Sequence, residues 1–367
     1  MTRDGGRIPS LDGLRALSIS AVLLGHLAGT QHFPPSLAAV IRNGRVDIAD
    51  LGVRVFFVIS GFLITGLLIA EHERSGTISL QRFYLRRTLR IFPAYFAYLA
   101  VVALLAAARV VEVSGWDFAH AVTYTMNYAP HRGWHLGHFW SLATEEQFYL
   151  LWPAVVLLIA PRRAFRVALA VVCLAPLVRL AEAAVLGHAA AGYVGTTFET
   201  TADAIAIGCV LALSRDALWT RPRYRWAVET PWVAPLLLLL GALIGLRFRP
   251  GLLLGATLGL VAIMLIIDRS VRLPRSRFGQ ILNSPMLVFV GTLSYSIYLW
   301  QQLFVNRSST SVLATFPLNI VLTLIAAMVS YYLVERPCLR LRPRLEARWL
   351  EPTAPVAEAR LEQVSGI

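Results

Sequence analysis

The sequence predicts an all-α fold, a polytopic membrane helix bundle of about ten transmembrane spans. Of its 367 residues, 57% are hydrophobic and only 15% are charged, and the mean hydropathy is +0.62. Apolar stretches of roughly 17 to 25 residues, long enough to cross a bilayer as helices, recur along the whole chain. No polar block is long enough to fold as a soluble domain. We therefore expect one integral membrane domain over residues 1–350 and a short, disordered cytoplasmic tail over residues 351–367.

Turn residues and charge clusters set the predicted boundaries of the spans. The first span includes Asp12, Arg15 and His26 and lacks a small-residue cleavage site, so we expect it to be retained and not removed as a signal peptide. The predicted spans cover residues 11–30, 51–70, 91–108, 139–160, 164–186, 195–214, 232–246, 251–267, 284–304 and 314–334.

The distribution of arginine predicts the orientation of the chain. All 34 basic residues are arginine, and most of them lie in the short loops on the side of the N-terminus. By the positive-inside rule, both termini face the cytoplasm in a multi-pass protein of the plasma membrane. The formal charge of +13 is therefore attributed to topology and anionic lipid headgroups, and not to nucleic-acid binding. The three cysteines have no metal-ligand spacing, so no metal site is expected. No bound cofactor is expected either.

Ionisable residues inside the predicted spans are the informative ones, because each costs about 2.5 kcal/mol or more at mid-bilayer. Asp12, Arg15 and His26 interrupt the first span. Arg15 and His26 are separated by close to three helical turns, so both side chains leave the same face of the helix, with a rise of about 16 Å between them. We expect the pair to line one wall of one cavity.

Several polar residues of other spans fall at the predicted depth of His26. They are Glu145 in the fourth span, Asp203 in the sixth, and Tyr295 and Tyr298 in the ninth. A carboxylate beside an imidazole fixes its tautomer and raises its basicity, so this layer is a candidate site for proton transfer. A structural interpretation stays open for each: a satisfied core histidine, an ion pair of Asp203 with Arg179, or an interfacial tyrosine belt.

A cluster of arginines precedes the third span, in LQRFYLRRTLRIFP. Arg87 and Arg90 are spaced i, i+3, so on a helix they share a face and could grip a phosphate group together from the cytoplasmic side. A topology and lipid-headgroup signal is the alternative for the whole cluster, which includes Arg86. Ser60 and Gly61, in FFVISGFLI, favour close helix packing.

Six stretches together resemble the acyltransferase family 3 membrane proteins, which O-acylate bacterial polysaccharides, lipopolysaccharide, glycolipids and some secreted antibiotics. They cover nearly the whole chain in the family's order. The stretches are LDGLRALSISAVLLGH, GVRVFFVISGFLIT, FYLRRTLRIFPAYF, FWSLATEEQFYLLWP, LSYSIYLW and LVERP.

The resemblance implies roles for individual residues. His26 becomes the catalytic residue with Glu145 as its acidic partner, and the arginines become contacts for an acyl-coenzyme A donor bound from the cytoplasm. The implied donor-binding set is Arg15, Arg86, Arg87 and Arg90, and the implied acceptor or support set is Asp12, Ser60, Asp203, Tyr295 and Tyr298. This chain departs from the family pattern at Gln301 and Leu303, where His and Pro are usual, and at Thr201, where Arg is frequent.

These observations lead to the hypothesis of a membrane-bound acyltransferase. It would move an acyl group, by default acetyl, from cytoplasmic acyl-coenzyme A to a hydroxyl of a sugar, a glycolipid or a secreted macrolide-like metabolite. His26 would act as general base oriented by Glu145, or would carry the acyl group itself. A proton-coupled transporter or flippase that uses His26, Glu145 and Asp203 is the competing hypothesis. A non-catalytic assembly subunit is the third.

Overall fold

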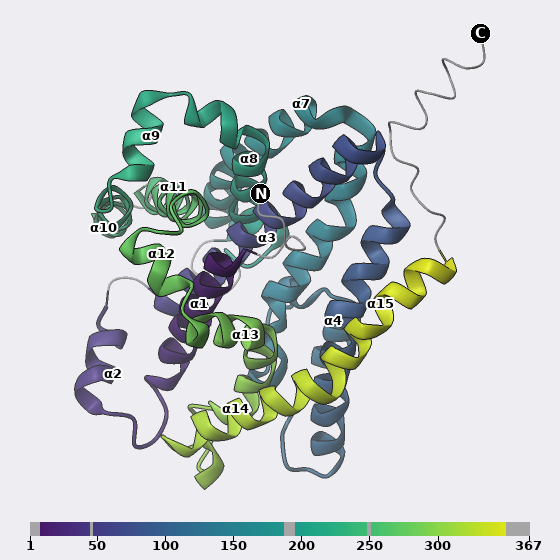
Figure 1. Ribbon diagram of the computed structural model, residues 1–367. Coiled ribbons are helices and arrows are strands. Elements are labelled where there is room, and N and C mark those ends of the chain that lie inside the picture. The colour runs from purple at the N-terminus through teal and green to yellow at the C-terminus, as the bar shows by residue number, and fades with distance from the viewer. Residues whose placement is uncertain (1–7, 45–46, 187–194, 248–250, 350–367) are drawn as a thin grey trace.

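The computed structural model is a helical bundle, and within the described residues every regular element is helical (Figure 1). The description covers residues 8–44, 47–186, 195–247 and 251–349. The tail predicted to be disordered, residues 351–367, lies outside them. The long helices are α1 (Pro9–Leu27), α3 (Ile48–Ser75), α4 (Leu80–Ala107), α7 (Phe139–Leu186), α8 (Phe198–Trp219), α10 (Val233–Arg247), α11 (Gly251–Arg272), α13 (Pro285–Phe304), α14 (Leu318–Ser330) and α15 (Arg336–Trp349).

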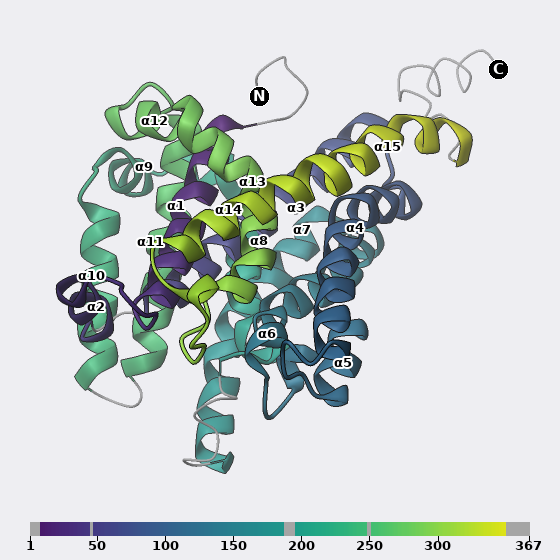
Figure 2. The same ribbon diagram turned by 90° about the horizontal axis from the view of Figure 1, so that it is seen from below.

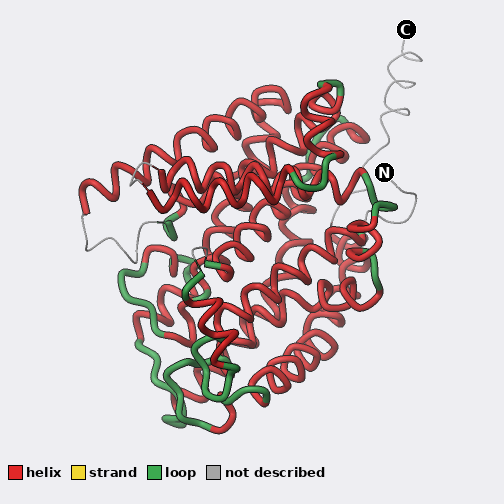
Figure 3. The backbone as a smooth tube through the Cα atoms, turned by 90° about the vertical axis from the view of Figure 1, so that its left-hand side faces the viewer, coloured by secondary structure: helices red, strands yellow, loops and turns green. Residues whose placement is uncertain are grey.

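Short helices connect the long ones. They are α2 (Pro35–Arg42), α5 (Gly115–Val122), α6 (Trp134–Gly137), α9 (Pro222–Glu229) and α12 (Arg277–Leu282), with 3₁₀ turns at Met126–Tyr128 and Val312–Ala314. A π-helical turn, Tyr331–Glu335, joins α14 to α15. In Figure 3 most loop segments lie at the ends of the helices, as expected when the bundle sides face lipid.

The chain fixes the ends of α3 and α4 by local hydrogen bonds. Asp47 caps α3 by accepting from the backbone N–H groups of Ala49 and Asp50, and Gly76 ends the helix in the left-handed conformation with φ 70°. Ser79 then caps α4 by accepting from the N–H of Arg82. The arginine cluster therefore lies inside the first turns of α4 and not in a loop before it.

A helix lies at the position of every predicted span, but the count of ten spans is not confirmed. Among the described residues, five helices are long and apolar enough to cross a membrane, or six if the bent pair of α9 and α10 is one span. Polar residues such as Asp12, Arg15 and Asp203 lower the hydropathy of α1 and α8. Two predicted spans also join in α7, which breaks at Ala160 (φ 62°) before Pro161.

The centre of the bundle consists of α1, α3, α8 and α13, with α10 and α11 on one flank and α4 and α15 on the other (Figures 1 and 2). Helix α1 packs on α3 and α13, and α8 packs on α3 and α7. At the crossing of α3 and α8, an added Cβ on Gly61 would lie 1.9 Å from the carbonyl oxygen of Ile205. Gly208 meets Val58 in the same way, at 2.1 Å from its carbonyl oxygen. Close packing at Gly61 is therefore confirmed.

The outer faces of the bundle are apolar. Leu158 on α7 and Leu239 on α10 are 79% and 56% exposed, and Val329 on α14 is 52% exposed. Exposed aliphatic side chains on long helices are typical of surfaces that contact lipid. The fold is that of a multi-pass membrane protein, and the polar residues described next lie in its interior.

Candidate active site

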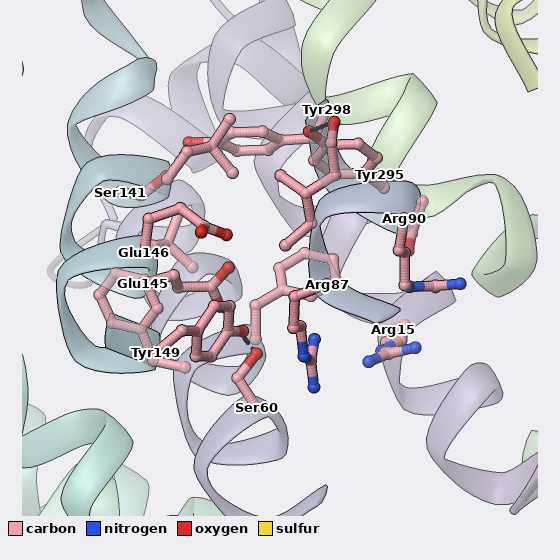
Figure 4. A pocket seen from close by; sticks show the side chains of 16 residues that line it. Arg15, Ser60, Arg87, Arg90, Ser141, Glu145, Glu146, Tyr149, Tyr295 and Tyr298 are labelled. Carbon is pink, nitrogen blue, oxygen red and sulfur yellow. Dashed lines mark hydrogen bonds between the residues drawn. The ribbon is translucent and has the colours of Figure 1, made fainter. Parts of the chain in front are cut away.

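Two adjoining cavities occupy the centre of the bundle. The first, here called the arginine cavity, is bordered by Arg15 from α1 and by Arg87 and Arg90 from α4 (Figure 4). The second, here called the histidine cavity, is bordered by His26 and His138. Val53 and Tyr298 line both cavities and form their common wall.

The three guanidinium groups gather on one side of the arginine cavity (Figure 4). Arg87 lies over the ring of Tyr149, 4.7 Å from its centroid, and Arg15 lies 3.8 Å from the carboxylate of Asp12. Among the described residues, no carboxylate lies within ion-pairing distance of Arg87 or Arg90. The pair can therefore bind an anionic ligand without first breaking an ion pair.

Arg86 does not border the cavity. Its Nε and Nη2 donate to the two carboxylate oxygens of Glu346 on α15, at 2.7 and 3.1 Å. Consecutive residues of a helix point about 100° apart, so Arg86 faces α15 while Arg87 and Arg90 face the cavity. The structure does not bring Arg86 into the expected donor-binding set.

Carboxylates lie opposite the arginines in the same cavity (Figure 4). Ser60 Oγ donates to Glu145 Oε1 at 2.8 Å, and Glu146 lines the cavity beside it. The expected pairing of Glu145 with His26 is not present, because Glu145 borders the arginine cavity and His26 the histidine cavity. Ser60, expected to serve helix packing or to support the site, binds Glu145 through this hydrogen bond.

His26 is bound by Gln301. Its Nδ1 lies 3.1 Å from Gln301 Oε1. An amide carbonyl oxygen can only accept, so Nδ1 carries the hydrogen and Nε2 keeps its lone pair. Trp134 meets the ring edge-on, with centroids 5.8 Å apart. The arrangement orients the imidazole through Nδ1 and leaves Nε2 without a hydrogen bond among the described residues.

Tyr298 connects the two cavities through the start of α7. Its hydroxyl lies 2.6 Å from Ser141 Oγ and 3.0 Å from the carbonyl oxygen of His138. Tyr295 lines the arginine cavity and donates to the carbonyl oxygen of Ile91 at 2.9 Å. Both phenols lie inside the bundle, so the alternative of an interfacial tyrosine belt is wrong.

Asp203 lies in neither cavity. Its carboxylate is 2.7 Å from Nη2 of Arg179, and the two residues are only 1% and 7% exposed. The structure therefore divides the predicted layer. Glu145 and the two tyrosines border the arginine cavity, His26 borders the histidine cavity, and Asp203 borders neither. Counting residues along a helix gives the depth of a residue in the bundle but not the direction in which its side chain points toward neighbouring helices. These groups lie apart because their side chains point in different directions.

Three residues have no role in the sequence-based hypothesis, although two of them line the cavities and the third binds His26. Gln301 appears there only as a departure from a family pattern, although it holds His26. His138 and Glu146 lie in HFWSLATEE, beside residues that the hypothesis does use. A buried polar residue next to a predicted site residue is the signal that could have found them.

The sequence matches the acyltransferase domain family, acyltransferase 3, over residues 8–336. The chain belongs to this family. Acyltransferase 3 proteins transfer acyl groups, so the arginine and histidine cavities are the candidate active site of an acyltransferase domain. No solved structure matches the chain.

Curated relatives of this acyltransferase 3 chain are O-acetyltransferases by name. A putative O-acetyltransferase of Staphylococcus aureus (strain COL) is 29% identical, over 90% of this chain and 57% of its own length. The peptidoglycan O-acetyltransferase OatA of Listeria monocytogenes is 28% identical, over 90% and 55%. The O-acetyltransferase OatA of S. aureus (strain NCTC 8325) is 30% identical, over 90% and 57%. The chain thus spans somewhat more than half the length of these relatives.

Proposed function

We propose that this acyltransferase moves an acetyl group from acetyl-coenzyme A in the arginine cavity to a hydroxyl of an acceptor in the histidine cavity. One observation carries the proposal: a cavity with three guanidinium groups and a cavity with a basic imidazole share the wall formed by Val53 and Tyr298. Two substrates that enter from opposite sides can then meet at one place.

The arginine cavity suits an anionic donor. Arg87 and Arg90 lie on the first turns of α4, near the end of the bundle where α1 begins and α15 lies (Figure 2). We assign this end to the cytoplasm, in keeping with the positive-inside rule. The phosphates of coenzyme A would bind the guanidinium groups, while the thioester reaches along the cavity toward Tyr298.

The histidine cavity would supply the chemistry on the acceptor. His26 Nε2 removes the proton of the acceptor hydroxyl as its oxygen attacks the thioester carbonyl carbon, the carbon–sulfur bond breaks, and the proton passes to the coenzyme A thiolate. Gln301 would stabilise the imidazolium through its carbonyl oxygen. The side chains of Val53 and Tyr298 would move for the acetyl group to pass.

The acceptor is proposed from the names of the relatives and from the polarity of the cavity. One relative is named for peptidoglycan. Asp50, Trp140 and Gln302 border the histidine cavity, and such a mixture of hydrogen-bonding and aromatic side chains suits a sugar. We therefore propose a glycan hydroxyl, ahead of a glycolipid or a macrolide-like metabolite.

Transfer without a membrane gradient tests this function. Purified protein in detergent, incubated with radiolabelled acetyl-coenzyme A and a peptidoglycan-type disaccharide, should give labelled, ester-linked product. Substrate flux in vesicles with no transfer in detergent would instead support the transporter hypothesis. The position of Asp203 already counts against a proton relay, because its pair with Arg179 lies outside the cavity of His26.

A further inference from the structure

His138 borders the histidine cavity with a ring that has no hydrogen-bond partner. The residue is only 5% exposed, yet among the described residues neither Nδ1 nor Nε2 makes a hydrogen bond. The carbonyl of Leu299 is nearby but outside hydrogen-bond geometry. The large majority of buried side-chain polar atoms in folded proteins are paired, so an unpaired imidazole on the lining of a cavity is a candidate contact for a ligand.

The backbone around His138 is held firmly while its ring is left available. Its carbonyl oxygen accepts from Tyr298 at 3.0 Å and from Ser141 at 3.2 Å. The ring packs among aromatic rings, with centroids 4.7 Å from Phe139 and 5.5 Å from Tyr98. The surroundings therefore orient the imidazole without using its nitrogens.

Gln302 also borders the histidine cavity and also has a buried polar atom without a hydrogen bond among the described residues. Its side-chain Nε2 donates to the backbone carbonyl oxygen of Trp134 at 2.8 Å, and its backbone carbonyl oxygen accepts from Trp134 Nε1 at 2.9 Å. Its side-chain oxygen Oε1 is buried and has no hydrogen bond among the described residues. An unpaired acceptor atom and an unpaired imidazole thus border one cavity beside His26.

We propose that His138 and Gln302 bind a second hydroxyl of the acceptor, distinct from the hydroxyl that His26 activates. The inference rests on the proposed function. A hydroxyl is the matching group, because it can donate its one hydrogen to Gln302 Oε1 while its oxygen accepts from the N–H of His138. The acceptor would therefore be a polyol, and a simple alcohol of equal size would bind poorly.

Monodeoxy analogues of a sugar test the proposal in the unaltered protein. The probe is methyl N-acetylglucosaminide with its full set of monodeoxy derivatives, and the readout is KM and kcat for label transfer from acetyl-coenzyme A. The analogue that lacks the hydroxyl normally acylated should show no transfer. The analogue that lacks the second hydroxyl should keep kcat and show a KM raised roughly 5- to 20-fold.

Variants connect that second hydroxyl to the two side chains. In His138→Phe and Gln302→Leu, the parent sugar should show the raised KM, and removal of the second hydroxyl should raise it no further. His138→Gln restores a hydrogen-bonding group and should recover part of the loss. His120→Phe is the matched control, since His120 is bound to Thr125 at 2.9 Å away from both cavities.

The outcomes separate this inference from the function on which it rests. An inactive unaltered protein, with every donor and acceptor tried, would overturn both. Transfer with equal KM for the parent sugar and every analogue that keeps the acylated hydroxyl would overturn the role of His138 and Gln302 alone. Because the analogues probe the unaltered chain, a variant that fails to fold leaves this test intact.

Discussion

His26 and Gln301 form a hydrogen bond between α1 and α13, with His26 Nδ1 3.1 Å from Gln301 Oε1. Gln301 is fully buried, so its amide can hold one orientation. In this chain, a neutral amide therefore sets which nitrogen of His26 carries the hydrogen.

Substitution of Gln301 tests that orientation. Gln301→Leu removes the acceptor for Nδ1–H and should lower kcat about 10- to 100-fold, with KM for acetyl-coenzyme A unchanged. Gln301→Glu keeps an acceptor oxygen and should retain more activity than the leucine variant. Steady-state kinetics with both substrates varied gives the answer. Equal kcat in the leucine variant and the unaltered protein would remove Gln301 from the mechanism.

The arginine cavity predicts a change in donor affinity. Arg87→Gln and Arg90→Gln should each raise KM for acetyl-coenzyme A about 10-fold, because each removes a charge-assisted contact to phosphate. Arg86→Gln is the matched control on the same turn of α4. Since Arg86 pairs with Glu346 on α15, its loss should lower thermal stability and leave KM unchanged. A similar KM increase in all three variants would indicate a general effect of losing positive charge and not a specific contact with the donor.

The ion pair of Arg179 and Asp203 predicts an effect on stability without an effect on chemistry. Asp203→Ala leaves a buried guanidinium unpaired and should destabilise the fold by about 3–5 kcal/mol. The double variant Asp203→Leu with Arg179→Met removes both charges and should recover most of that loss. Thermal unfolding in detergent measures the stability, and activity per folded molecule should stay constant. A loss of activity in a stable double variant would give Asp203 a functional role.

The crossing of α3 and α8 predicts a difference between two glycines of one helix. Gly61→Ala places a methyl group against the carbonyl of Ile205 and should lower the melting temperature by several degrees. Gly66→Ala is the control, because no atom lies within 4 Å of its added Cβ. That variant should melt at the same temperature or slightly higher, since alanine favours helix. Equal effects at both positions would contradict the close crossing.

Much of the fold follows from local patterns that the sequence displays directly. Apolar runs place a helix at every predicted span, and the i, i+3 spacing of Arg87 and Arg90 places both on the cavity face. The spacing of Arg15 and His26 likewise puts both beside cavities stacked along α1. These relations depend only on the geometry of a single helix.

Relations between helices could not be predicted in the same way. Arg86 faces Glu346, which is 260 residues away in sequence, and Glu145 turns to Ser60 and not to His26. Which side chain meets which depends on how each helix is rotated in the bundle, and hydropathy alone does not fix this rotation. For the same reason the expectation of one cavity became two that share Val53 and Tyr298.

His26 is proposed to act on an acyl group delivered from the arginine cavity, so its loss should stop transfer without stopping donor binding. The most direct test is a single-turnover measurement of label transfer from acetyl-coenzyme A in His26→Ala, alongside donor binding by the same preparation. We predict that acetyl-coenzyme A binds within twofold of the unaltered protein while transfer falls at least about 100-fold. Full transfer by the alanine variant would show that His26 takes no part in the reaction.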